Sequence, residues 1–219
     1  MPIEAVVFDV GETLIDETRV WGSWADAVDV PRLTFFAALG AVVANGERQH
    51  TARIFELVRP GLTFEAAAAA RGTDEAGFTP GDLYPDARPS LRALHEAGLQ
   101  VGIAANQPPL AALVLERCDL AYDWLLISAL ERVAKPEPDF FALVARRAGL
   151  PPERIAYVGD RVDNDVVPAA AAGLRAVHVR RGPWGVLHAG DPRLAVAALR
   201  AEHLGEVAAW AIGARGRAS

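Results

Sequence analysis

The sequence predicts an α/β protein that has a parallel sheet as its core and an inserted helical domain. Three observations support this class. A short apolar segment, Ala5–Phe8, opens the chain, and from residue 86 onward further apolar segments alternate with helical patterns. Such alternation is typical of βαβ units and a parallel sheet. Between these parts, residues 16–84 space their apolar positions as helices do and contain no evident strand.

The first apolar segment predicts a strand that is buried on both faces. Asp9 follows it directly, and Thr13 adds a hydroxyl shortly afterwards. Gly11 is expected to let the chain turn sharply. Open α/β sheets place their chemistry at the carboxyl ends of their strands, so Asp9 is predicted to lie at the mouth of a site.

The inserted segment is predicted to be helical, because apolar residues recur at helical spacing over 33–41, 50–58 and 64–71. A connection of this length is not a plain loop in a compact domain. We therefore expect a core domain over residues 1–15 and 85–219 and a helical domain over residues 16–84. Trp21 and Trp24 lie at helical spacing and are expected in the packing of the helical domain.

The remainder of the core domain follows from the same alternation. Gly98, Gly149 and Gly173 stand where a helix would end before the next strand. The predicted strands cover residues 100–105, 124–128, 154–158 and 176–179, and the predicted helices cover 110–117, 139–148 and 165–172.

Composition narrows the class of protein. The chain has 219 residues, which is enough for a sizeable core, and a net charge of −6, which gives no basic surface for nucleic acid. Its single cysteine, Cys118, excludes an internal disulfide and suits a reducing compartment. The chain start has no basic leader, and no apolar run reaches the ~18 residues of a membrane span. We expect a cytoplasmic protein, monomeric or homodimeric, with no membrane or nucleic-acid partner.

Polar residues that carry chemistry stand at the predicted strand ends. They are Asp9, Asn106, Lys135 and the acidic loop at 159–165. In a parallel sheet these positions converge. Crowded carboxylates stay ionised together only beside a cation, and oxygen ligands suit Mg²⁺. Lys135 and the Asn106 amide suit a phosphate group. This set predicts phosphoryl transfer through an aspartyl-phosphate.

Four segments in this order resemble the motifs of the haloacid dehalogenase-like hydrolase superfamily. They are FDVGETL at 8–14, the strand that ends in Ala105-Asn106, KPEP at 135–138 and VGDRVDND at 158–165. The inserted helices resemble the C1 cap of its subfamily I, and LYPDARPSLRALHEAG at 83–98 resembles the return from cap to core. The resemblance covers nearly the whole chain. It implies a Rossmann-like core with a helical cap, and a hydrolase that acts on a small phosphorylated metabolite.

The resemblance also implies a role for each matching position. Asp9 would be the nucleophile, and Lys135 would stabilise it together with the phosphoryl oxygens. Gly11 would offer its backbone carbonyl to Mg²⁺. The implied catalytic residues are Asp9 and Lys135, the implied phosphate-binding residues are Thr13, Ala105, Asn106 and Lys135, and the implied metal ligands are Asp9, Gly11, Asp160 and Asp165.

Two positions depart from the family pattern. Phosphatases of the family usually carry an acid where this chain has Gly11, and loss of a general acid–base costs about 10²–10⁴-fold in rate. Glu12 is one residue out of place and is not expected to replace that acid. Ala105 stands where a Ser or Thr hydroxyl would bind phosphate. The sequence therefore predicts slow turnover.

These departures leave two alternatives open. A 2-haloacid dehalogenase, in which an Asp attacks carbon without a metal, also lacks the second acid of the first motif. A binding or regulatory protein would have lost turnover and kept its Mg²⁺ and anion sites.

Overall fold

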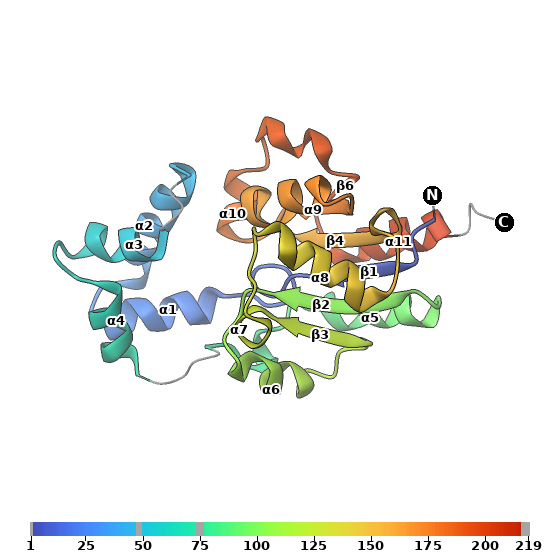
Figure 1. Ribbon diagram of the computed structural model, residues 1–219. Helices are drawn as coiled ribbons and strands as arrows, with labels where there is room; N and C mark the ends of the chain where they lie inside the picture. Colours follow the sequence, from blue (N-terminus) through green and yellow to red (C-terminus); the bar gives the residue numbers. More distant parts are fainter. Residues whose placement is uncertain (1, 47–49, 73–76, 216–219) are drawn as a thin grey trace.

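The computed structural model describes residues 2–46, 50–72 and 77–215. Within these residues one sheet of six parallel strands forms, in the order β3-β2-β1-β4-β5-β6 (Figure 1). The strands are β1 (Ala5–Phe8), β2 (Gln100–Ala105), β3 (Trp124–Ile127), β4 (Ile155–Gly159), β5 (Arg175–Val179) and β6 (Leu199–Ala201). The predicted fold class is confirmed.

The position of β1 in the sheet creates the site. β1 lies between β2 and β4, and Phe8 pairs with Ile103 on one side and Val158 on the other. The strand order changes direction at β1, and such a switch point opens a crevice at the carboxyl edge of the sheet. Asp9, Asn106 and Asp160 leave their strands at this edge.

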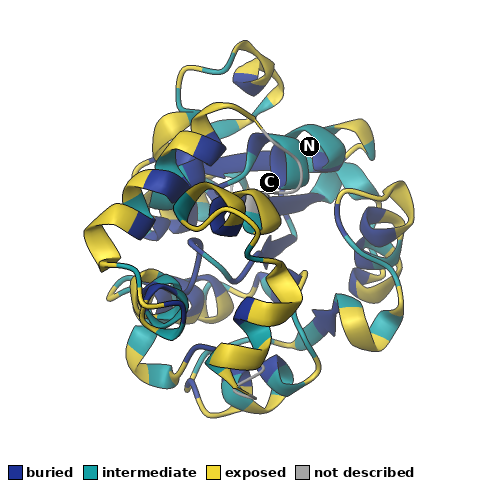
Figure 2. Cartoon of the chain, turned by 90° about the vertical axis from the view of Figure 1, so that its left-hand side faces the viewer, coloured by how far each residue is buried: buried dark blue, intermediate teal, exposed yellow. Residues whose placement is uncertain are grey.

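Helices cover both faces of the sheet because neighbouring strand residues point to opposite sides. Val6 and Phe8 pack with α5 (Ala87–Glu96), α6 (Leu110–Glu116) and α11 (Leu204–Arg215). Ala5 and Val7 pack with α8 (Pro138–Ala148) and α9 (Val167–Ala171). Figure 2 shows buried strands inside helices whose outer sides are exposed. The remaining core helices are α7 (Ser128–Glu131) and α10 (Gly182–Leu187).

The chain between β1 and α5 is helical and has its own apolar cluster, in which Phe35, Leu39, Ile54 and Phe55 are buried. Trp184 of α10 joins this cluster, so the helical segment contacts the core beside the carboxyl edge of the sheet. Its helices are α1 (Thr18–Ala27), α2 (Arg32–Ala44), α3 (His50–Val58) and α4 (Phe64–Arg71), drawn at the left of Figure 1.

The described helices are short or only partly apolar along their length. None of them alone is long and apolar enough to cross a membrane, whereas the bent pair α1 and α2 passes by length and composition.

The described structure differs from the predicted elements in a few places. β6 was not predicted, because it has three residues and one of them is exposed. The predicted helix over 165–172 begins earlier, as a π-helix η3 (Val162–Val166) that continues into α9. The π-turn forms because the N–H groups of Asp165 and Val166 both donate to the Arg161 carbonyl. Short 3₁₀ helices complete the fold: η1 (Pro80–Asp82), η2 (Pro152–Arg154) and η4 (Pro192–Val196).

Candidate functional site

Lys135 joins two carboxylates at the carboxyl edge of the sheet. Its Nζ lies 2.6 Å from Asp9 Oδ1 and 2.7 Å from Asp165 Oδ1. Its side chain is 1% exposed, and it is the only lysine in the chain. A compact ammonium group can serve two carboxylates at once, which a planar guanidinium does less readily. The strand-end positions predicted to converge here do come together.

Asp160 completes an acidic cluster with Asp9 and Asp165. One carboxylate oxygen of each residue lies within 4.8 Å of the others, and all three residues are buried. Oδ2 of Asp160 is buried and finds no hydrogen-bond donor among the described residues. A buried carboxylate oxygen without a donor is costly unless a cation binds it. Three clustered carboxylates therefore fit Mg²⁺, which prefers hard oxygen ligands.

The cluster is held in place by close packing. The Asp165 carboxyl group lies directly against Gly159, where a Cβ would stand 2.4 Å from the Asp165 Cγ. The backbone N–H of Arg161 donates to Asp165 Oδ2 at 3.0 Å. Because Lys135 binds the other oxygen, both oxygens of Asp165 have partners and the orientation of the group is fixed.

Burial and neighbouring charges change the pKa values of Asp160, Asp165 and Lys135. Burial, followed by the charges of Asp165 and Asp9, raises the pKa of Asp160 well above its ordinary value. Burial raises the pKa of Asp165 to about 6, although Lys135 opposes the rise. Burial disfavours the charge on Lys135, yet the two aspartates hold its pKa well above the ordinary value. The cluster carries more negative charge than one lysine balances, which favours a bound cation.

Asn106 is bound to the backbone of Lys135. Its Nδ2 donates to the Lys135 carbonyl at 2.9 Å, and its Oδ1 accepts from the Lys135 N–H at 2.8 Å. Asn106 thus positions Lys135, and it also lines the cavity at this edge. Thr13 and Ala105 are fully buried. Neither of them is among the residues found to line that cavity.

The turn after Asp9 is shaped by Glu12. Glu12 has a φ of 51°, in the left-handed region that costs energy for a residue with a side chain. Gly11, in contrast, is not among the described glycines that have a positive φ. The left-handed residue of this turn is therefore Glu12 and not Gly11. The Glu12 carboxylate accepts from the Tyr84 hydroxyl at 2.6 Å and from the Glu17 N–H at 3.1 Å.

A cavity of about 310 Å³ opens in front of Asp9 between the core and the helical segment, and we call it the carboxylate cavity. The core contributes its acidic and basic groups, and the helical segment contributes Glu17, Trp21 and Thr51. Its lining residues are Asp9, Gly11, Glu12, Glu17, Trp21, Thr51, Asn106, Gln107, Lys135, Asp160, Arg161, Asn164 and Trp184.

Glu17 is a site residue that the sequence analysis missed. Burial raises the pKa of its carboxyl group to about 8, and the charges of Glu12 and Asp9 add to the rise. Glu17 lies outside the strand-end motifs, and its backbone N–H donates to the Glu12 carboxylate of the turn. The available signal was a carboxylate placed directly before the helix that starts at Thr18.

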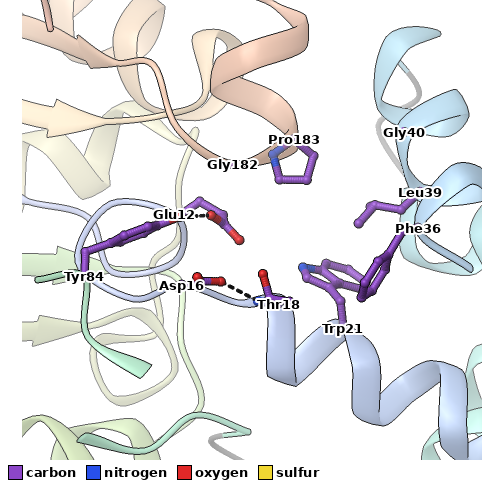
Figure 3. Close-up of a pocket in the computed structure, with 10 residues that line it drawn as sticks. All are labelled: Glu12, Asp16, Thr18, Trp21, Phe36, Leu39, Gly40, Tyr84, Gly182 and Pro183. Atoms are coloured by element: carbon purple, nitrogen blue, oxygen red, sulfur yellow. Dashed lines mark hydrogen bonds between the residues drawn. The ribbon is translucent and has the colours of Figure 1, made fainter. Parts of the chain in front are cut away.

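A second cavity of about 270 Å³ adjoins the first, with Glu12 and Trp21 lining both. We call it the apolar cavity. In Figure 3, Trp21, Phe36 and Leu39 of the helical segment face Pro183 and Tyr84 of the core across it. Among the described residues that line it, none is a lysine or an arginine. The others are Asp16, Thr18, Gly40 and Gly182.

Comparison with known proteins gives three findings. The family described as haloacid dehalogenase-like hydrolase matches residues 3–173. The glyceraldehyde 3-phosphate phosphatase of Methanopyrus kandleri is 30% identical over 203 residues, which cover 83% of this chain and 86% of that protein. The phosphoglycolate phosphatase of Salmonella paratyphi A is 38% identical over 103 residues, which cover 46% of this chain and only 40% of that protein.

The fold is also found in solved structures. The L-2-haloacid dehalogenase of Xanthobacter autotrophicus superposes with a TM-score of 0.65 at 21% identity, over 96% of this chain and 99% of that one. At this level of identity the likeness concerns the fold alone.

Proposed function

The chain belongs to the haloacid dehalogenase-like hydrolase family, and we propose that it is a Mg²⁺-dependent phosphatase that acts on a small phosphorylated metabolite. One observation carries the proposal. The Asp9 carboxylate, held by Lys135, stands beside the buried oxygen of Asp160 that has no donor among the described residues. This arrangement pairs a nucleophile with an incomplete cation site. The phosphatase relative that aligns with most of the chain supports the same reaction.

Asp9 would attack phosphorus, and the ester oxygen would leave as the Asp9–phosphoryl bond forms. Water would then attack the aspartyl-phosphate and release inorganic phosphate. Lys135 would hold Asp9 in place and balance the charge of the phosphoryl oxygens. Asn106 and the backbone N–H groups around Ala105 would bind the same oxygens. Thr13, whose buried Oγ1 has no hydrogen-bond partner among the described residues, would add a hydroxyl to this set.

Mg²⁺ would be held by Asp9, Asp160 and Asp165 and by the backbone carbonyl of Gly11. When bound, it supplies positive charge that balances the carboxylates and the phosphoryl group. Gly11 has no side chain to act as an acid. An enzyme with no other acid at that place would hydrolyse unactivated esters about 10²–10⁴-fold more slowly than one that has such an acid.

Removal of the metal tests the proposal. Phosphate release from an aryl phosphate should fall to background in chelator and return when Mg²⁺ is added, because the acidic cluster loses its counter-charge. Halide release from a 2-chloro acid, measured on the same protein, should be absent. Halide release at the same rate with and without chelator would establish the dehalogenase alternative. Phosphate binding without release from any substrate would establish the binding-protein alternative.

We also propose that the helical segment, residues 16–84, caps the site and selects the leaving group through the apolar cavity. Trp21 lines both cavities, so a leaving group that extends from the phosphorus would enter between Trp21, Phe36 and Pro183. Glu12 and Asp16 line the same space, and they would repel an anion there. The geometry therefore favours a neutral, largely apolar leaving group.

A substrate comparison tests the cap proposal. kcat/KM for phenyl phosphate should exceed that for phosphoglycolate by about tenfold or more, as an apolar pocket discriminates by 10–200-fold. Phe36→Ala should lower kcat/KM for phenyl phosphate and leave that for phosphoglycolate within about twofold. Leu113→Ala, at an exposed position of α6, serves as the control variant. A preference for phosphoglycolate would exclude the apolar cavity as the leaving-group site.

A further inference from the structure

Glu17 occupies the space that a side chain at residue 11 would need. A Cβ built on Gly11 would stand 2.6 Å from Glu17 Oε1 and 2.9 Å from its Cδ. Gly11 is not among the glycines with a positive φ, so a side chain here would meet the Glu17 carboxyl group and not backbone strain. The Glu17 carboxyl group thus stands beside the backbone of the nucleophile loop, two residues beyond Asp9.

Glu17 is held by one hydrogen bond at its carboxyl group and by another at its backbone N–H. The indole N–H of Trp21 donates to Glu17 Oε2 at 3.2 Å, and the Glu17 backbone N–H donates to Glu12 Oε1 at 3.1 Å. Glu12 is itself fixed by the Tyr84 hydroxyl at 2.6 Å. This chain of contacts keeps Glu17 at the start of α1 and Oε1 next to Gly11.

Glu17 and Glu12 have different surroundings. Each Glu12 oxygen already accepts a hydrogen bond from a protein donor. Oε1 of Glu17 is the oxygen closest to the Gly11 position, and Glu17 lines the carboxylate cavity. Of the two, Glu17 is the group placed to exchange a proton with a bound molecule, and Glu12 is a positioning residue.

We propose that Glu17 is a catalytic residue, which protonates the leaving oxygen and later deprotonates the attacking water. The proposal rests on the phosphatase function proposed above. As Asp9 bonds to phosphorus, the ester P–O bond breaks and the leaving oxygen takes the Glu17 proton. Water then attacks phosphorus, the bond from phosphorus to Asp9 breaks, and Glu17 takes the proton of the water. Glu17 ends in its starting state.

Replacing Glu17 by Gln tests the proposal with two leaving groups. Gln keeps the size of the side chain and can still accept from Trp21. With an alkyl phosphate, whose leaving oxygen needs a proton, kcat should fall by about 10²–10⁴-fold. With an activated aryl phosphate, the first step needs no acid, but hydrolysis of the aspartyl-phosphate still lacks its base. Glu17→Gln should therefore give a burst of one aryl alcohol per enzyme, followed by slow release.

Variants at Gly11 test the geometry independently. Gly11→Ala places a methyl group where the Glu17 carboxyl group lies, and it should reproduce the loss of activity on the alkyl phosphate. Gly11→Asp alone should give no gain, because the new side chain competes with Glu17 for one space. The double variant Gly11→Asp, Glu17→Ala should recover at least tenfold over Glu17→Ala.

The controls separate the possible failures. Glu4→Gln makes the same exchange near the opposite end of β1, where Glu4 pairs with Arg154, and it should keep its activity. Thermal unfolding verifies that each variant folds. If the wild type hydrolyses both esters and folded Glu17→Gln matches it without a burst, the Glu17 proposal is overturned and the phosphatase stands. If the wild type releases no phosphate from either ester, the phosphatase proposal itself fails.

Discussion

Asp9→Asn should reduce phosphate release by about 10⁴-fold or more, the order of loss seen when a covalent nucleophile is removed. Asn is nearly the same size as Asp, and its oxygen can still accept from Lys135 where Asp9 Oδ1 now lies at 2.6 Å. It has no charge and cannot form the phosphoryl bond. Loss of one carboxylate also relieves repulsion with Asp160 and Asp165, so the variant should remain folded.

Steady-state phosphate release and a stopped-flow burst measurement check this result together. Asp9→Asn should show neither turnover nor a burst, whereas Glu17→Gln should show the burst. Asp29→Asn is the matched control, because Asp29 is exposed and has a left-handed φ of 53° that Asn also tolerates. Turnover that persists in Asp9→Asn would falsify covalent catalysis by this residue.

The convergence of Asp9, Lys135 and Asp160 could be predicted because it follows from local patterns and sheet topology. Asp9 and Asp160 directly follow buried strands, Lys135 lies in the loop between α7 and α8, and parallel strands bring their carboxyl ends to one edge. The distances of 2.6 and 2.7 Å at Lys135 depend on packing that no single segment encodes. The backbone contacts of Asn106 depend in the same way on a second loop.

Gly11 shows why the rest could not be predicted. In the sequence, a glycine after a strand indicates a turn, and its missing acid indicates a slow enzyme. In the structure, the left-handed residue is Glu12, and the space beside Gly11 holds the carboxyl group of Glu17. That group arrives from the start of α1, through contacts with Glu12 and Trp21. A pattern based on the first motif alone cannot find a side chain that enters from the next element.

Lys135→Met should destabilise the metal-free protein by about 3–5 kcal/mol, because it leaves buried carboxylates without their partner. The Lys135 and Asp165 side chains are 1% and 0% exposed, so water cannot replace the lost contact. Urea unfolding in chelator measures the change. The double variant Lys135→Met, Asp165→Asn should recover much of the loss, since it removes both charges together.

The destabilisation by Lys135→Met should grow as pH rises. Burial already raises the pKa of Asp165 to about 6 in the folded wild type, and loss of the Lys135 charge raises it further. A carboxyl group with a raised folded pKa holds its proton more tightly in the folded state. The protonated carboxyl group therefore stabilises the folded protein fully at a pH below the pKa that the group has in the unfolded chain. This stabilisation is lost as the pH rises through the pKa that the group has in the folded protein. The stability difference between wild type and Lys135→Met should therefore be larger at pH 8 than at pH 5, and an equal or smaller difference at pH 8 would contradict the buried charge pair. Arg180→Met, which breaks the exposed pair with Glu202, should cost less than ~1 kcal/mol at either pH.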